Sequence, residues 1–371
     1  MPLSCAASCS FALLSVVVVA GGLPGQHTFT VGAGTTYPQI ADALAVADVG
    51  DTVLVLPGSY TGFYLLEGVT IRALVPGTVS VDGGFISQVH APAGQTAQLV
   101  GLRFASLGLI GRAVLDQCVV DGSHGTLTIS SATVTMRACT VAPPATPWIP
   151  IQNAVNILYS DVSAIDCQFV GHASIPSQST TAEVALDLVA ARFRGSFLTL
   201  IGGSGDPQTG YLPALRVDGA SEVRISDSML SATGTCAVES SGDVLLDRCA
   251  VTPTCAAVGN GPVLGVQQTG PLQNGMPFVL AFHTAAGGVV GVWAAERFVA
   301  TPSPVFEPSV LLDPVAAFPA ALLVADGAGV APATWSIPAD GALVDRSFWF
   351  QGIGGLALPL LTSPLGGGVI R

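Results

Sequence analysis

The chain has 371 residues, of which 50% are hydrophobic and only 10% are charged, so it can bury a large core and is not disordered as a whole. Its 44 glycines and 26 prolines favour many short strands joined by turns over amphipathic helices. The formal net charge is −12 and every basic residue is an arginine. Because nucleic acids bind to basic faces, we expect no nucleic-acid partner.

The amino-terminal segment has the pattern of an export signal. Residues 11–20 (FALLSVVVVA) form an apolar run that is followed by Gly-Gly-Leu-Pro-Gly, as in the core and processing zone of a secretory signal peptide. The run is too short to span a bilayer, and Gly, Pro or charge interrupts every later apolar stretch. We therefore predict a signal peptide over residues 1–25, a secreted protein that is extracellular or at the cell surface, and no transmembrane span.

A short helix and a buried strand are predicted next. Over residues 37–47, Ile40, Ala43, Leu44 and Ala47 share one helical face, Pro38 suits the first turn and Gly50 follows the end. Residues 51–60 (DTVLVLPGSY) then give a buried strand that a Pro-Gly turn closes.

From residue 69 onward a pattern repeats around one small or apolar residue, which we call the anchor. Successive anchors lie between 16 and 37 residues apart, and apolar or small residues stand five and three positions before each anchor and two positions after it. The anchors are Leu74, Leu102, Cys118, Cys139, Cys167, Ala191, Ser228 and Cys249. The spacing predicts one coil per repeat, with loops of variable length.

The parity of this pattern predicts a corner inside each repeat. Offsets −5 and −3 share one strand parity, whereas offsets 0 and +2 share the other, so the chain must bend for all four side chains to point inward. We expect Asp116, Asp166, Asp227 and Asp247 at these corners, because Asp tolerates strained backbone conformations. The sequence predicts a further strand before the two strands that each corner joins, for example at residues 127–130, 154–157, 214–217 and 236–239. Each coil is therefore predicted to contain three short strands.

These features resemble the pectin-lyase-like right-handed parallel β-helix superfamily. Residues 35–73 (TTYPQIADALAVADVGDTVLVLPGSYTGFYLLEGVTIRA) are similar to the amino-terminal cap of many such proteins, and the likeness extends over about residues 28–260. It implies a right-handed parallel β-helix over residues 26–260. It implies little about function, because this fold carries lyases, hydrolases, esterases, epimerases, adhesins and proteins without known activity.

Residues 261–371 have a different character. Alternating segments at 334–338 and 347–351, turns and a Pro-rich join at 301–308 predict a small antiparallel β-sandwich. This part resembles a carboxy-terminal module of varied secreted bacterial proteins. The predicted fold class is therefore all-β, a β-helix followed by a β-sandwich.

Cysteines and histidines offer few chemical sites. Cys236 and Cys255 stand in matching Thr-Cys-Ala contexts about one coil apart, so we predict a disulfide between them. Cys118, Cys139, Cys167 and Cys249 read as a buried stack, in which a bond between Cys118 and Cys139 stays open. His124 and His172 read as loop residues, and no Cys-x-x-Cys or His-x-x-x-His spacing indicates a metal site.

The first strand of each coil forms the ligand groove in the families that the chain resembles. Its outward positions here are Thr128, Ser130, Asn156, Glu183, Arg216 and Glu239. A structural ladder of ion pairs is the simplest interpretation of the charged members. The alternative is a polysaccharide lyase acting on a uronate polymer, with Arg216 as base and with Glu183 and Glu239 as carboxylates that could hold Ca²⁺. No other cofactor is expected.

Motifs of other enzymes in this superfamily are missing. The chain has no Asp-Asp pair and no Gly-His-Gly, only Ser-His-Gly at residues 123–125, and it lacks the Gly-x-x-Asp-Phe-Ile-Phe-Gly strand of pectin methylesterases. The sequence therefore favours a secreted, non-catalytic scaffold that contacts a polysaccharide or a cell-envelope component through Thr128, Asn156, Arg216 and Glu239. The lyase stays as the alternative, and the oligomeric state is open.

Overall fold

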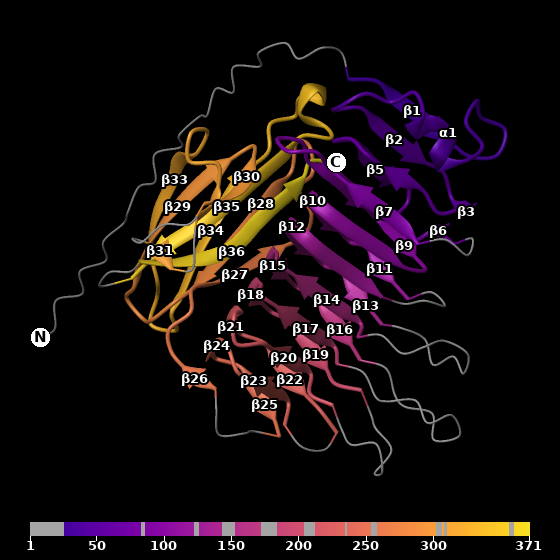
Figure 1. The fold of residues 1–371 in the computed structure, drawn as a ribbon. Helices are drawn as coiled ribbons and strands as arrows, with labels where there is room; N and C mark the ends of the chain where they lie inside the picture. Colours follow the sequence, from indigo (N-terminus) through magenta and orange to yellow (C-terminus); the bar gives the residue numbers. More distant parts are fainter. Residues whose placement is uncertain are drawn as a thin grey trace, which may run out of the picture.

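The computed structural model describes residues 26–82, 86–121, 126–142, 153–171, 184–203, 212–233, 236–253, 258–301, 306–307, 310–355 and 360–371. Its larger part is a coil of parallel strands, stacked one turn upon the next (Figure 1). Each complete coil contributes one strand to each of three sheets. This confirms the predicted all-β class and the β-helix with three strands per coil.

The first sheet carries the predicted ligand-groove positions, and the second sheet follows it around a corner. Strands β10 and β12 run through this corner and belong to both sheets, because β10 pairs with β7 at its start and with β8 at its end. The first sheet comprises β4 (Tyr64–Leu65), β7 (Ser87–His90), the starts of β10 (Leu107–Asp116) and β12 (Leu127–Arg137), β14 (Val155–Leu158), β17 (Leu186–Val189), β20 (Leu215–Val217) and β23 (Val238–Ser240).

The second and third sheets complete each coil. The second comprises β1 (Thr28–Val31), β2 (Thr52–Val55), β5 (Thr70–Ala73), β8 (Ala97–Val100), the ends of β10 and β12, β15 (Asp161–Ile165), β18 (Arg192–Ser196), β21 (Glu222–Ser226), β24 (Asp243–Asp247) and β26 (Gly259–Asn260). The third comprises β3 (Gly58–Tyr60), β6 (Val79–Val81), β9 (Leu102–Phe104), β11 (Val119–Val120), β13 (Thr140–Val141), β16 (Gln168–Val170), β19 (Thr199–Ile201), β22 (Met229–Ser231) and β25 (Ala250–Thr252).

The corner between the second and third sheets is a single residue in the left-handed backbone region. Gly101 holds this corner with φ of 69°, and the non-glycine residues there have φ between 49° and 56°; they are Gln117, Ala138, Asp166, Phe197, Asp227 and Arg248. Asp166 and Asp227 thus occupy the predicted corner, but the prediction was wrong for Asp116 and Asp247, which end β10 and β24 one residue earlier. Stacked strands above and below the corner stabilise this conformation, so residues other than Asp are accepted there.

The anchor position is also corrected in two coils. Pairing of the third sheet places Val79 beside Leu102, and Leu198 between Cys167 and Ser228. Leu74 is 51% exposed, and Ala191 lies at the corner between the first and second sheets. Both corners of a coil show the same parity change, which is why the sequence pattern did not distinguish them.

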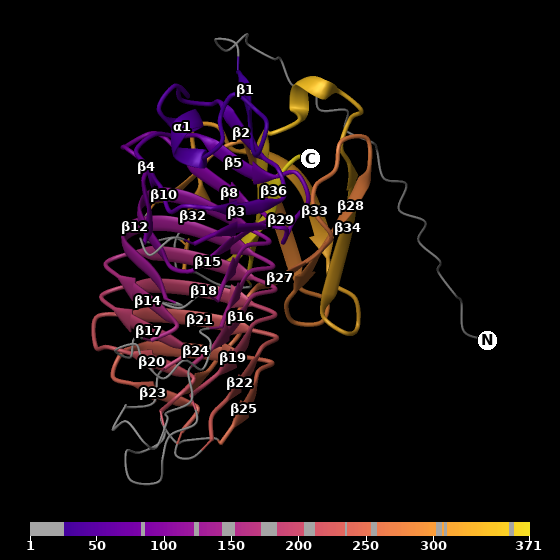
Figure 2. The ribbon, with the colours of Figure 1, turned by 90° about the vertical axis from the view of Figure 1, so that its right-hand side faces the viewer.

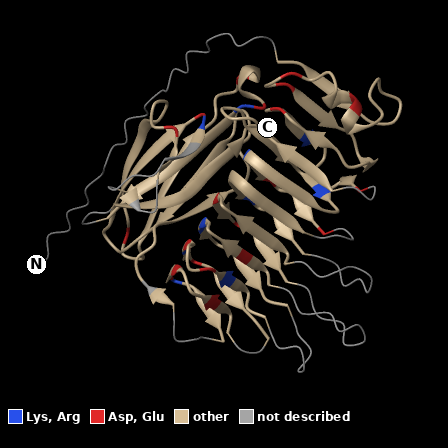
Figure 3. Ribbon diagram, in the orientation of Figure 1, with Lys and Arg blue, Asp and Glu red and all other residues tan. Residues whose placement is uncertain are grey.

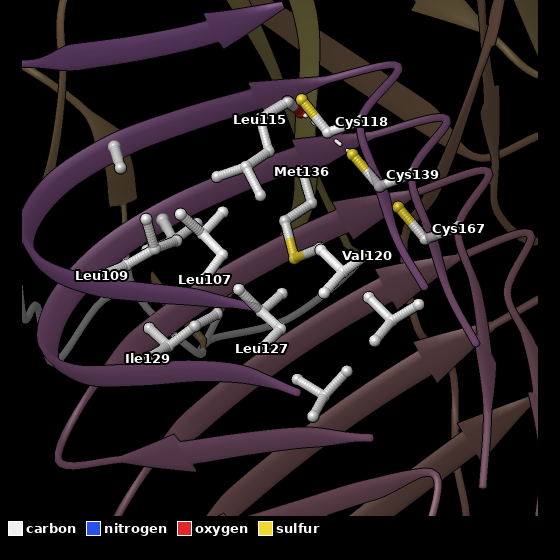
Figure 4. Packing of buried hydrophobic residues seen from close by; sticks show 14 of the residues in the cluster. Leu107, Leu109, Leu115, Cys118, Val120, Leu127, Ile129, Met136, Cys139 and Cys167 are labelled. Carbon is white, nitrogen blue, oxygen red and sulfur yellow. Dashed lines mark hydrogen bonds between the residues drawn. The ribbon is translucent and has the colours of Figure 1, made fainter. Parts of the chain in front are cut away.

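The interior of the coil is a continuous apolar column. Leu107 stacks on Leu127 and Leu109 on Ile129, and all four are at most 1% exposed (Figure 4). Burial of a side chain of this size contributes about 1.5 to 3 kcal/mol. Cys118, Cys139 and Cys167 form the predicted buried stack in the same column, whereas Cys249, the fourth predicted member, is only half-buried; all four are free thiols.

Helix α1 (Ile40–Leu44) covers the amino-terminal end of the coil. Ile40 and Ala43 are buried against it, and the Asp42 carboxylate accepts a hydrogen bond of 3.0 Å from the Gln39 backbone N–H, which stabilises the first turn. The helix therefore closes the end where the column would otherwise meet solvent.

After β26 the chain folds into two sheets that pack face to face. Strands β27 (Gly265–Thr269), β28 (Pro277–His283) and β34 (Val330–Ser336) form one sheet; β31 (Phe306–Glu307), β36 (Leu360–Val369), β35 (Ser347–Gly354), β29 (Val289–Ala295) and β33 (Phe318–Val324) form the other, beside the pair β30 (Phe298–Thr301) and β32 (Val310–Leu312) and a single 3₁₀ turn (Gly341–Leu343). Leu280 and Phe282 of one sheet share a core with Val290 and Val292 of the other. This confirms the antiparallel sandwich.

The sandwich lies along the second sheet of the coil, with β27 and β36 against β15 and β18 (Figure 2). Both faces of the second sheet are therefore buried in these coils. Small hydroxyl residues line the contact: Ser163 Oγ accepts a hydrogen bond of 3.0 Å from the Leu365 N–H, and Ser196 Oγ accepts one of 3.3 Å from the Val266 N–H.

Ion pairs join the sandwich and the coil at this contact. Arg72 pairs with Asp345 at 3.1 Å, and Arg371 reaches Asp116 at 2.7 Å and the side-chain oxygen of Gln117 at 2.7 Å. Asp116 also pairs with Arg137, whose Nη1 donates to the Gly270 carbonyl at 3.1 Å. The two parts of the chain thus share buried charged contacts as well as apolar ones.

Candidate functional site

A row of polar side chains runs across the outer face of the first sheet, one per coil. The inward neighbours in each strand are buried apolar residues, so strand alternation turns these side chains outward. Strand register aligns them in the order Thr128, Asn156, Asp187, Arg216 and Glu239, which we call the polar row. The acidic, basic, acidic order of β17, β20 and β23 can be followed in Figure 3.

An ion pair with two hydrogen bonds forms the centre of the polar row. Arg216 donates from Nε to Asp187 Oδ1 at 2.9 Å and from Nη2 to Asp187 Oδ2 at 2.6 Å. The side chain of Arg216 is 40% exposed and that of Asp187 is 14% exposed. The paired, planar geometry holds the guanidinium in one orientation while one face stays open to solvent.

Asn153 ties this ion pair to the neighbouring coil. Its Nδ2 donates to Asp187 Oδ2 at 2.8 Å and to Asn156 Oδ1 at 2.9 Å, and its Oδ1 accepts from the Val184 N–H at 3.3 Å. Asn153 was not among the predicted site residues. It precedes the strand rather than lying in it, so the alternation of the strand gave no signal for it.

The electrostatics of the polar row oppose a catalytic base. Hydrogen bonds to Asp187 raise the pKa of Arg216, burial opposes this rise, and the charges of Asp187 and Glu239 add to it. A general base must lose its proton near the working pH, and a raised pKa makes this harder. Arg216 therefore serves as a fixed cation and hydrogen-bond donor in this arrangement.

The polar row is also a poor fit for Ca²⁺, which the lyase alternative requires. Both carboxylate oxygens of Asp187 accept hydrogen bonds from Arg216, and one also accepts from Asn153. Glu239 lies on the other side of the guanidinium. A cation beside Arg216 would meet like charge, and only one carboxylate of the row is open to it.

The structure brings most of the predicted groove residues together. Thr128, Asn156, Arg216 and Glu239 lie on one face in register, and Ser130 lies in the adjacent row. Glu183 lies outside the described residues, so its role stays a prediction. The place between Asn156 and Arg216 belongs to Asp187, which sequence reasoning missed, although its position between Leu186 and Leu188 matches that of Asn156 between Val155 and Ile157.

An adjacent row on the same face is largely apolar. Register aligns Ser130 with Leu158 and Leu158 with Val189, and all three are half-buried. Ile110, which is 42% exposed, extends this row in the preceding coil, and Tyr159, which is 67% exposed, lies beside it. We call Ile110, Leu158 and Val189 the apolar row.

The cysteines give no reactive centre among the described residues. Burial raises the pKa of the Cys118 and Cys167 thiols, and it raises the pKa of Cys249 to about 11. For Cys139 burial acts in the same direction, but hydrogen bonds with Cys118 and Cys167 outweigh it and lower the pKa; this thiol is only 2% exposed, so a substrate does not reach it. Thiols that resist ionisation are poor nucleophiles. Cys236 lies two residues before the start of β23, whereas Cys255 lies outside the described residues, so the disulfide between them stays a prediction.

His124 and His172 also lie outside the described residues. In the part of the chain that the structure describes, no three His, Cys, Asp or Glu side chains are grouped as a metal ion would need. Over the same residues no helix is long and apolar enough to cross a membrane.

A second ionisable cluster lies where the sandwich meets the last coils, and sequence reasoning did not find it. Arg248 pairs with Asp227 through Nε at 2.7 Å and Nη2 at 2.9 Å, and it also pairs with Asp247. The ring of His283 lies 3.8 Å from Asp227 and packs edge-on against Phe197, with ring centroids 5.0 Å apart. The members come from β28 of the sandwich and from corners of the coil, so only the tertiary contact brings them together.

This cluster makes the contact sensitive to acid. Burial lowers the pKa of His283, Arg248 lowers it further, and Asp227 and Asp326 oppose the shift. The unfolded chain therefore takes up the proton first as the pH falls through about 6.5, and stability is lost on acidification. We expect thermal unfolding of the wild type to shift down more between pH 7.5 and 5.5 than that of His283→Gln.

The matched control for this prediction is His90→Gln, because His90 is exposed on the first sheet. Its pH profile should follow that of the wild type. Parallel profiles for wild type and His283→Gln would contradict the assignment of the acid effect to His283.

Comparison with known proteins places the chain in no family. No protein-family model matches the chain, and no curated protein is significantly similar to it. Among solved structures, the enzymatically active domain of tailspike protein 2 from bacteriophage CBA120 is similar with 9% sequence identity and a TM-score of 0.29, over 82% of this chain and 53% of that chain. The chain spans about half the length of that structure, and a likeness this weak carries no argument about function.

Proposed function

We propose that the chain is a secreted, non-catalytic β-helix protein of the pectin-lyase-like type, which acts as an extracellular or cell-surface scaffold and binds glycans along the first sheet. The observation that carries this proposal is the paired hydrogen bonding of Arg216 to Asp187. It fixes a donor on an accessible face and at the same time keeps the guanidinium charged. Such a group is suited to binding and unsuited to proton abstraction.

The remaining polar row supports the same function. Glu239 is exposed, and Thr128 and Asn156 are half-buried, so hydroxyl, amide and carboxylate groups are presented at intervals of one coil. Polysaccharides offer hydroxyl groups at regular intervals, and repeated hydrogen bonds along an extended surface suit such a ligand. The sandwich covers the second sheet and leaves this face of the first sheet open, and we propose that it serves attachment or sorting.

The lyase remains the second candidate function, with Arg216, Glu183 and Glu239 as its residues. The test is a panel of neutral and uronate-containing polysaccharides, scored in parallel for binding and for new reducing or unsaturated ends. We expect binding without new ends, and Arg216→Ala should weaken binding about tenfold, since a hydrogen bond to a charged group contributes about 1.5 to 3 kcal/mol.

Arg103→Ala provides the matched control for Arg216→Ala. Arg103 forms an ion pair of 2.7 Å with Asp121 on the third sheet, so the variant removes the same charge from another face. Its glycan binding should equal that of the wild type. If the wild type produces unsaturated ends and Arg216→Ala does not, the scaffold proposal is wrong and the protein is a lyase.

A further inference from the structure

The polar row carries more negative than positive charge. Its charged members are Asp187, Arg216 and Glu239, and both Nε and Nη2 of Arg216 donate hydrogen bonds to Asp187. The carboxylate of Asp218, at the end of the same sheet, is engaged by the hydroxyl of Ser221 and the backbone N–H of Ala190. A ligand on this face therefore meets the open carboxylate of Glu239 and a guanidinium that is already neutralised.

A uronate polymer is poorly matched to this charge. Each uronate carboxylate would have to displace Asp187 from Arg216 or lie beside like charge. Neutral sugars have no such conflict, because their hydroxyl groups both donate to Glu239 and accept from the amide of Asn156. The hydrogen-bonding needs of an exposed carboxylate and of a fixed amide are then both met.

The apolar row supplies the second requirement for a neutral sugar. A pyranose ring has hydroxyl groups at its edge and a face of C–H groups, so it combines polar and apolar surface. Leu158 and Val189 lie beside Asn156 and Asp187 in the same two strands. Tyr159, which follows Leu158 at the corner, adds an exposed aromatic side chain at the margin of the apolar row.

We infer that the first sheet selects neutral polysaccharides over uronate-containing ones, through the net negative charge of the polar row and the neighbouring apolar row. This inference rests on the proposed glycan binding and names its ligand class. The exposed carboxylate of Glu239 repels uronate groups. Asp187 occupies Nε and Nη2 of Arg216, so the arginine is not available to attract them.

The test measures the affinity of the full chain for a neutral glucan and for polygalacturonate of similar length, at low and high salt. At low salt we expect the neutral polymer to bind at least about tenfold more tightly than polygalacturonate. This difference in affinity should become smaller at high salt, because salt screens the charge repulsion. Glu239→Gln removes the charge at an exposed position but keeps an oxygen that accepts hydrogen bonds. At low salt it should therefore raise the affinity for polygalacturonate and leave the affinity for the neutral polymer unchanged.

The double variant Asp187→Asn with Glu239→Gln changes the net charge of the row from −1 to +1, by two acids removed beside one arginine, and should reverse the preference. Asp121→Asn removes one acid beside the third sheet, as Glu239→Gln does on the first, so it is the control for that single variant and should keep the wild-type preference. Equal or tighter binding of polygalacturonate by the wild type would overturn the selectivity and leave glycan binding standing. Binding to no polysaccharide at all would remove the proposed function together with this inference.

Discussion

Asp116→Ala is expected to lower the free energy of unfolding by about 3 to 5 kcal/mol, because it leaves two arginines without their counter-charge at a buried contact. Asp116 is 1% exposed, and its two carboxylate oxygens pair with Arg137 at 2.5 Å and with Arg371 at 2.7 Å. Arg137 is itself only 6% exposed. Denaturant unfolding of the full chain measures the loss.

The control for this change is Asp121→Ala. Asp121 pairs with Arg103 at 2.7 Å, but the two side chains are 23% and 53% exposed, so the loss should stay below about 1 kcal/mol. Asp116→Asn should fall between the two, because it keeps the size of the side chain and removes only the charge. Equal losses for the alanine variants at positions 116 and 121 would show that burial of the Asp116 ion pairs does not govern stability.

Gly111→Ala is the second change for which we expect a large effect, a decrease of roughly 3 kcal/mol in the free energy of unfolding. Gly111 adopts φ of +81° where β10 turns from the first sheet to the second, and an added Cβ would lie 2.0 Å from the Ala91 carbonyl oxygen of the preceding coil. A left-handed non-glycine residue costs about 1 to 2 kcal/mol, and forced displacement of packed atoms adds about 1 to 3 kcal/mol.

Gly108→Ala tests whether geometry rather than the loss of a glycine is responsible. Gly108 lies in the same strand, and its added Cβ would lie 3.7 Å from Gln88 Cγ and 3.9 Å from the Ser87 carbonyl oxygen, both ordinary contact distances. We expect its stability to change by less than about 1 kcal/mol. Denaturant unfolding measures both variants, and a similar loss of stability for the two would exclude the steric explanation.

The fold could be predicted from the sequence because one physical requirement repeats in every coil. Side chains such as Val134 and Val162 must point inward at matched positions, and the change of parity reveals a corner. The same requirement applies at both corners of a coil, however, so Ala191 was taken for the position that Leu198 holds. Pairing between coils decides between the two, and it involves residues about thirty positions apart.

The candidate site could be predicted only in part. Strand alternation was enough to place Asn156, Arg216 and Glu239 outward, and Asp187 follows from the same rule once the strand is located. The hydrogen bonds of Asn153 could not be predicted, because they depend on how the chain enters the strand. The cluster around His283 could not be predicted either, since the sandwich and the coil come together through tertiary packing alone.

The lateral position of the sandwich also bears on how the coil unfolds. In a simple solenoid each turn contacts only its neighbours, so turns can open one after another from an end. Here β36 contacts β10, β15 and β18 at once, and Asp345 reaches as far as Arg72 in β5. Because the sandwich contacts several turns at once, these turns cannot unfold independently of it. We therefore expect the coil and the sandwich to unfold together in one cooperative transition rather than turn by turn from an end.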